Sequence, residues 1–158
     1  MYIPTLKQLK QQKGFTLVEI LVVIGILAIL LAITLVAINP GQHFIDSRNS
    51  QRQANVTAIL DAIYEYESNH SGNVPPSLSS LASTPKLIGT ATGEIDLCAD
   101  IVPADIADLP IDPSTGTKAA ATCDAGNYET GYNIAKSASN RFTVAAPDAE
   151  GATISVTR

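Results

Sequence analysis

An unbroken apolar run of 24 residues, from Phe15 to Ile38, is the feature that most constrains this chain. Within it, only Thr16, Glu19 and Thr34 carry groups that favour water. A helix of this length extends about 36 Å at about 1.5 Å per residue, whereas the hydrocarbon core of a bilayer is about 30 Å thick. A core helix of a soluble domain would show a polar face. The run therefore predicts a membrane-spanning helix.

Glu19 is the anomaly of this run. A carboxylate costs roughly 2.5 to 3.5 kcal/mol at the centre of a spanning helix, and somewhat less near its end, so it needs a partner. The nearest cation in the sequence is Lys13, outside the run. If the chain is cut between Gly14 and Phe15, the new α-amino group lies four residues from Glu19. It then lies one turn away in the same helix, or faces Glu19 of the next copy in a bundle.

Residues 13–19, with the sequence KGFTLVE, lead into the apolar run. This segment resembles the class III signal of type IV pilins and of the pseudopilins of type II secretion. The family pattern has a short basic leader, cleavage after a glycine, an N-methylated phenylalanine at the new start and a glutamate as fifth mature residue. Gly14, Phe15 and Glu19 match it position for position. The resemblance implies cleavage after Gly14, methylation of Phe15 and a role for Glu19 in assembly.

The residues before the run predict its orientation. Lys7, Lys10 and Lys13 precede it, and basic residues favour the cytoplasmic side, so everything after Pro40 should face the exterior. An ordinary secretory signal peptide is the alternative. Such peptides have a shorter apolar region followed by a small-residue cleavage site, which does not follow here.

The charge of the processed chain argues against nucleic-acid binding. Without the leader, seven bases stand against fifteen acids, a formal charge of -8. Phosphate affinity depends on clustered Lys and Arg, and the remaining bases make no obvious stripe, so we expect no direct nucleic-acid binding. Arg48 and Arg52 repel each other mildly at i,i+4 spacing. A subunit partner that neutralises them is one explanation, but we expect two solvated arginines.

The sequence Asn39-Pro40-Gly41 interrupts the helical pattern. Pro40 lacks an amide proton and clashes with the carbonyl four residues before it, so it predicts either the end of the membrane helix or a kink followed by continuation. From about Gln42 to Asn69 apolar residues recur at spacings of three and four, which predicts an amphipathic helix.

The remaining residues predict a small extracytoplasmic head. Cys98 and Cys123 are expected to form a disulfide; a zinc site is the competing interpretation, but two sulfurs without nearby histidines do not complete its ligand shell. Three stretches alternate polar and apolar residues over the length of a strand: Tyr132–Lys136, Arg141–Ala146 and Thr153–Thr157.

We therefore predict an α+β fold. A long N-terminal helix, with a membrane half and an amphipathic half, packs on a small antiparallel sheet of about three strands, as the pilin resemblance also implies. The expected divisions are a cleaved leader (1–14), a transmembrane and filament-core helix (15–39), the amphipathic half of the helix (40–72) and a globular head (73–158).

We find no pattern that predicts catalysis, a metal site or a cofactor. No nucleophile has a nearby histidine in sequence, no glycine-rich phosphate loop follows a strand, and His43 and His70 lie at opposite ends of one predicted helix. The acidic series between Glu94 and Asp112 does not match the spacing of an EF-hand loop, so we expect a solvated acidic surface. An enzyme is therefore not expected.

The function expected from the resemblance is that of a type IV pilin, a structural subunit that forms a homo-oligomeric helical filament. The expected partners are a prepilin peptidase, an inner-membrane platform protein and a cytoplasmic assembly ATPase. The precursor is expected in the inner membrane, and the assembled pilus outside the cell. Two alternatives stay open: a pseudopilin of type II secretion, and a single-span anchored domain that binds a ligand and never polymerises.

Overall fold

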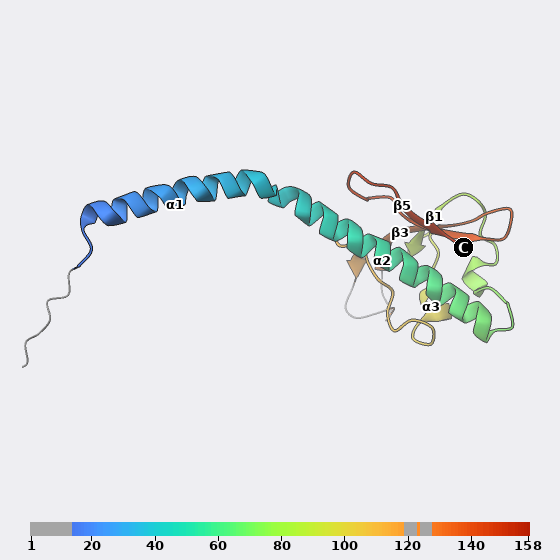
Figure 1. The fold of residues 1–158 in the computed structure, drawn as a ribbon. Helices are drawn as coiled ribbons and strands as arrows, with labels where there is room; N and C mark the ends of the chain where they lie inside the picture. Colours follow the sequence, from blue (N-terminus) through green and yellow to red (C-terminus); the bar gives the residue numbers. More distant parts are fainter. Residues whose placement is uncertain (1–13, 119–122, 124–127) are drawn as a thin grey trace, which may run out of the picture. The chain divides into compact units, whose positions relative to one another are not determined.

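The computed structural model describes residues 14–118, 123 and 128–158 (Figure 1). The chain divides into two compact units, one ending at Gly41 and the other running from Gln42 to Arg158. The helical elements are α1 (Leu17–Ile38), α2 (Pro40–Asn69), the 3-10 helix η1 (Pro76–Leu78) and α3 (Cys98–Ile101). The strands are β1 (Lys86–Gly89), β2 (Thr117–Lys118), β3 (Tyr128–Lys136), β4 (Phe142–Ala146) and β5 (Ile154–Thr157).

Helical structure runs from Leu17 to Asn69 with one interruption, at Asn39. This residue caps α1 in the left-handed conformation, with φ 43° and ψ 70°. Pro40 is the first residue of α2, where its missing amide proton costs no helical hydrogen bond, and Gly41 follows inside the same helix. The structure therefore has a helix end and an immediate restart, and α2 begins two residues before the predicted Gln42.

The sheet is antiparallel, with the strand order β1-β3-β4-β5. β2 pairs with the first residues of β3, on the side opposite β1, because Glu129 faces both Gly89 and Thr117. The three strands predicted from alternation correspond to β3, β4 and β5, which confirms a long helix packed on a small antiparallel sheet. β1 and β2 were not predicted, and β3 begins four residues earlier than expected, at Tyr128.

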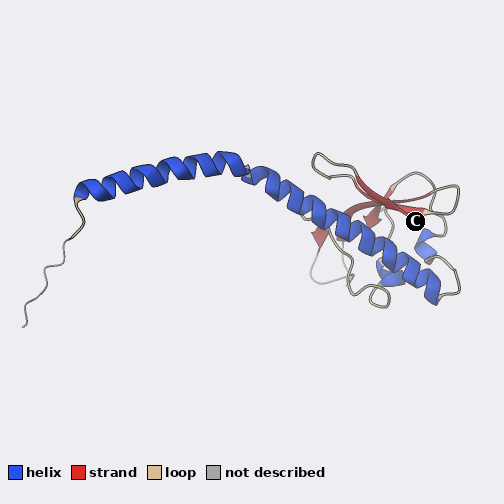
Figure 2. Ribbon diagram, in the orientation of Figure 1, coloured by secondary structure: helices blue, strands red, loops and turns tan. Residues whose placement is uncertain are grey.

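Helix α2 covers one face of the sheet (Figure 2). Its buried apolar residues are Val56, Ile59, Leu60, Ala62 and Ile63. They meet inward-facing side chains of the strands, of which Tyr132, Ile134, Phe142 and Val144 are all at most 1% exposed. The strict alternation of buried and half-buried residues along β4 is what one covered face requires.

The predicted disulfide between Cys98 and Cys123 is present, with the two Cα atoms 5.3 Å apart. Cys98 is buried at the start of α3. The bridge therefore connects the segment after β1 to the segment before β3, and closes a loop with a sequence separation of 25 residues.

Candidate functional site

The N-terminus of α1 holds the residues predicted for processing and assembly. Gly14 is exposed, and Phe15 is exposed by 83%. Thr16 is the N-cap residue, with extended backbone at φ -81° and ψ 152°. Its Oγ1 accepts from the amide of Glu19 at 3.2 Å. In return its amide and hydroxyl both donate to Glu19 Oε2, each at 3.0 Å.

These bonds form a capping box, which satisfies backbone donors that a helix end otherwise leaves open. We did not expect it from the sequence, although Thr16-x-x-Glu19 is its signature. The cap satisfies hydrogen bonds but brings no positive charge. Both bonds to Glu19 end on Oε2, and among residues 14–118, 123 and 128–158 no cation is bonded to this carboxylate.

The rest of α1 presents apolar side chains on every side. Its large hydrophobic residues between Leu17 and Val36 are each exposed by 50% or more. The hydroxyl of Thr34 donates to the carbonyl of Leu31 at 3.0 Å, so it is satisfied inside the helix. Among the described residues one helical stretch is long and apolar enough to cross a membrane, and it begins at Leu17. Burying each such side chain is worth roughly 1.5–3 kcal/mol, so the helix requires an apolar environment.

A second charged centre, on α2, has the opposite character. Arg52 is fully buried, and each of its three guanidinium nitrogens is bonded. Nε donates to Asp112 Oδ2 at 2.7 Å, and Nη2 donates to Asp112 Oδ1 at 3.2 Å and to Ser114 Oγ at 2.6 Å. Nη1 donates to Asn49 Oδ1 at 3.0 Å and to Glu150 Oε1 at 3.3 Å. The expectation that Arg52 is solvated was wrong.

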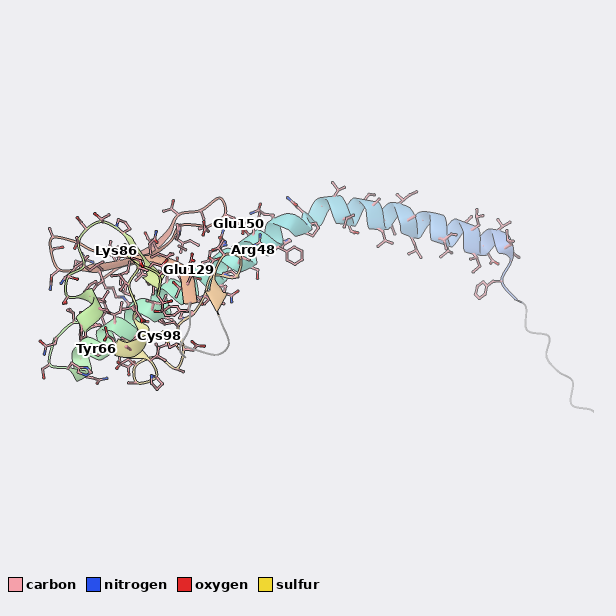
Figure 3. The ribbon with its side chains drawn as sticks, turned by 180° about the vertical axis from the view of Figure 1, so that it is seen from behind. Arg48, Tyr66, Lys86, Cys98, Glu129 and Glu150 are labelled. Atoms are coloured by element: carbon pink, nitrogen blue, oxygen red, sulfur yellow. A yellow bond between two sulfur atoms is a disulfide. The ribbon has the colours of Figure 1, made fainter. Side chains whose placement is uncertain are left out.

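Arg48 binds the loop between β4 and β5 (Figure 3). Its Nε and Nη2 donate to the two carboxylate oxygens of Glu150, at 2.6 and 2.5 Å. Asn49 adds a bond from Nδ2 to the Glu150 carbonyl at 2.8 Å. The hydrogen bonds from Arg48 are the main cause that lowers the pKa of Glu150 below its ordinary value. The two arginines are thus neutralised within their own chain, which removes the need for a subunit partner there.

Asp112 is also placed differently from the expectation, because it is buried rather than part of a solvated acidic surface. The turn after it, residues 113–115, lies against β3. The Asp112 amide donates to the Thr130 carbonyl at 2.7 Å, and a Cβ on Gly131, which has φ 79°, would lie 2.7 Å from Asp112 Cβ. Burial alone raises the pKa of Asp112, but hydrogen bonds from Arg52, Ser114 and Thr115 outweigh it and lower the pKa well below the usual range.

The remaining candidate residues do not converge on a reaction centre. His43 is exposed on α2, and His70 is exposed in the turn directly after it, where it stacks on Tyr66 with ring centroids 3.8 Å apart. Within the described part of the chain no three His, Cys, Asp or Glu side chains are arranged to hold a metal ion. Of the predicted site residues, the structure groups Gly14, Phe15 and Glu19 at the start of α1.

Comparison with known proteins gives a match to this same N-terminal segment. Residues 9–35 carry the prokaryotic N-terminal methylation motif. This motif is the class III signal peptide of type IV pilins and pseudopilins, so the resemblance noted in the sequence is confirmed. Together with the apolar α1, it supports a membrane-anchored precursor of the pilin or pseudopilin type. No curated protein and no solved structure matches the chain.

Proposed function

We propose that this chain is a pilin that is cut after Gly14 and polymerises through α1 into a type IV pilus. The observation that carries the proposal is the apolar surface of α1, which has the methylation motif at its start and one carboxylate to which no cation of the described residues is bonded. The bilayer holds this helix before assembly. Packing against the same helix of other copies then exchanges lipid contacts for protein contacts.

The capping box fits this sequence of events. Cleavage after Gly14 leaves the Thr16 amide, the Thr16 hydroxyl and the Glu19 carboxylate in the chain, so the helix start stays capped by the bonds described above. It also creates a positive α-amino group at Phe15, next to the N-cap residue. The cap therefore holds the carboxylate at a fixed place while its charge stays available to a cation.

Glu19 would then set the position of each new subunit. A charge inside hydrocarbon is costly, and a neighbour that brings its Phe15 amine against Glu19 relieves that cost. A subunit that docks displaced along the filament axis from this position leaves the carboxylate without a cation. This selects one axial displacement from the many that an evenly apolar helix allows.

The proposed partners follow from what assembly requires. A prepilin peptidase in the inner membrane cuts after Gly14 and methylates Phe15. A platform protein and a cytoplasmic ATPase then extract the helix from the bilayer, which requires energy. The head, in this proposal, stays outside the cytoplasm throughout and forms the filament surface.

The test separates the charge of Glu19 from its capping bonds. Glu19→Gln keeps a side chain suited to a capping box but removes the charge, Glu19→Ala removes both, and Thr16→Ala removes the cap hydroxyl but keeps the charge. We expect membrane insertion in all three variants, no filaments by electron microscopy with either Glu19 variant, and filaments in reduced number with Thr16→Ala.

Wild-type filament numbers with Glu19→Gln would show that the charge has no role in assembly. If deletion of the protein blocks secretion and leaves surface filaments intact, the protein is a secretion pseudopilin instead. A wild-type protein that is anchored in the membrane but never found in a filament would support the other alternative, a single-span anchored domain that binds a ligand.

A further inference from the structure

Basic residues gather at one end of the sheet in the head. Each strand of the order β1-β3-β4-β5 has one at this end: Lys86 starts β1, Lys136 ends β3, Arg141 precedes β4 and Arg158 follows β5. The register brings them together, because Lys86 pairs with Ile134, and Lys136 pairs with Phe142. We call these four residues the basic end. In Figure 3, Lys86 lies at the opposite end of the head from Arg48 and Glu150.

Two acids of α2 face the basic end but do not neutralise it. Asp61 forms an ion pair with Arg158. Glu67 lies near Lys136, and its pKa is raised mainly by burial, against the opposing effect of that lysine. Lys136 also lies over the Phe142 ring, 5.4 Å from its centroid. With four bases and two acids, this surface keeps a positive charge, and Lys86 and Arg141 are exposed on it.

The segment from residue 94 to residue 108 has the opposite charge. It contains Glu94, Asp96, Asp100, Asp105 and Asp108, and no Lys or Arg occurs anywhere from 87 to 117. Four of these carboxylates accept hydrogen bonds from neutral donors: Glu94 from the Ala91 amide, Asp96 from Tyr128, Asp100 from the Ser77 amide and Asp105 from Asn69. Neutral donors leave the negative charge in place. We call residues 94–108 the acidic segment.

The two surfaces are built from different segments of the head. The acidic segment runs beside β1, as the bridge between Ile88 and Ile95 shows, and β1 is one edge of the sheet. The basic end crosses the sheet at the ends of its strands, from Lys86 on β1 to Arg158 after β5, the other edge. A contact between the basic end of one copy and the acidic segment of the next joins two different surfaces. In a row of copies joined in this way, one basic end and one acidic segment stay unused at the two ends. The row can therefore be extended by further copies without closing on itself.

We propose that the basic end is a docking surface for the acidic segment of a second copy of this chain. The proposal rests on the filament function proposed above and adds a head-to-head contact to it. Opposite charges on one chain give each copy the complementary surface, and such rim charges mainly set orientation and the rate of encounter. Nucleic acid is disfavoured as the occupant, because the processed chain carries a formal charge of -8.

The first test reads the contact directly in wild-type filaments. A zero-length carbodiimide joins a lysine amine to a carboxylate with which it is in contact. We expect the covalent dimer band to contain peptides that link Lys86 or Lys136 to a carboxylate of the acidic segment. Dimers linked only through other residues would overturn the proposal and leave the filament function standing. Absence of any wild-type filament would contradict the filament function itself.

The second test changes the charges. We expect Lys86→Glu combined with Arg141→Glu to reduce filament number to roughly one tenth of wild type or less, because like charges across an interface are strongly unfavourable. Lys86→Arg with Arg141→Lys keeps the charge and is the matched control, expected at wild-type level. Adding Ala99→Lys and Ala104→Lys, at exposed positions of the acidic segment, to the reversed chain should restore filaments.

Two results would count against a second copy as the occupant. One is a normal filament number in the charge-reversed variant. The other is normal filaments that lose retention of a double-stranded DNA fragment, which would assign the basic end to nucleic acid. Reduced filaments in the reversed chain, without restoration by the two added lysines, would also overturn a direct contact between these surfaces.

Discussion

The two units of this chain treat charge in opposite ways. In the head, Arg52 is fully buried, and both Asp112 and Glu150 of the same chain meet it. At the start of α1, Glu19 has its hydrogen bonds from Thr16 but no cation bonded to it among the described residues. The head neutralises these buried charges within one copy, whereas α1 leaves one charge to its surroundings.

The apolar side chains show the same difference. Ile59 of α2 is fully buried in the head, whereas Ile24 of α1 is exposed by 58%. Burial of apolar area is the main stabilising term in folding, so the head gains it alone and α1 gains it only from lipid or other chains. The comparison teaches that the head buries its own apolar side chains, whereas α1 requires lipid or other chains to cover them.

Breaking the central ion pair of the head should have the largest effect. Arg52→Ala leaves Asp112 buried without its cation, which should lower the free energy of unfolding by about 3–5 kcal/mol. Denaturant unfolding of the full-length protein in detergent measures this. Arg48→Ala is the control, because its side chain is 35% exposed, and it should cost less than about 1 kcal/mol. Equal losses from both variants would contradict the distinction between a buried and a surface pair.

Removing the disulfide tests whether the head relies on covalent support. Replacing both Cys98 and Cys123 by serine opens a loop with a separation of 25 residues, and should cost about 3–4 kcal/mol on the chain-entropy estimate. The same unfolding measurement checks it. A loss near zero would mean that the core holds this loop without the bridge.

A matched pair of substitutions sharpens the contrast between the units. Ile59→Ala creates a cavity in the core and should lower the unfolding free energy of the head by about 2–5 kcal/mol. Ile24→Ala removes the same atoms from the exposed helix and should change it by less than about 0.5 kcal/mol. Comparable effects in detergent would show that α1 contributes to the folding of the head.

Acid should weaken the head through Asp112 and Glu150. Both have a pKa below the ordinary value in the folded state, so the stability they contribute is present above the unfolded pKa, 3.8 for Asp112 and 4.5 for Glu150, and is lost as pH falls further through the folded values. The melting temperature should therefore decrease as the pH is lowered below about 4. The double variant Arg52→Met/Asp112→Leu should lose less stability on acidification than wild type.

Much of the fold follows from local sequence patterns. The apolar run predicts α1, Pro40 marks the restart of the helix, and alternation predicts β4 and β5 almost to the residue. β1 and β2 give too little signal, because they have four and two residues, and the pairing that defines them comes from β3. Strands this short are fixed by tertiary contacts rather than by periodicity.

The ion pairs of the head were harder to predict than its strands. Arg52 lies four residues before Val56, on the same helix face as the buried Ile59 and Ile63, and this spacing was the available signal for its burial. Its partners Asp112 and Glu150 are 60 and 98 residues away in sequence, so only the folded chain brings them to it. The capping box at Thr16 and Glu19, by contrast, was fully visible in the sequence.

The most direct test of the proposal that α1 assembles while the head folds on its own is the mass of the wild-type protein taken from cell-surface filaments. We expect an intact mass that begins at Phe15 with one added methyl group, because the proposed assembly requires the terminus made by cleavage after Gly14. A chain in those filaments that still begins at Met1 would contradict this, since Glu19 would then have no new amine to meet.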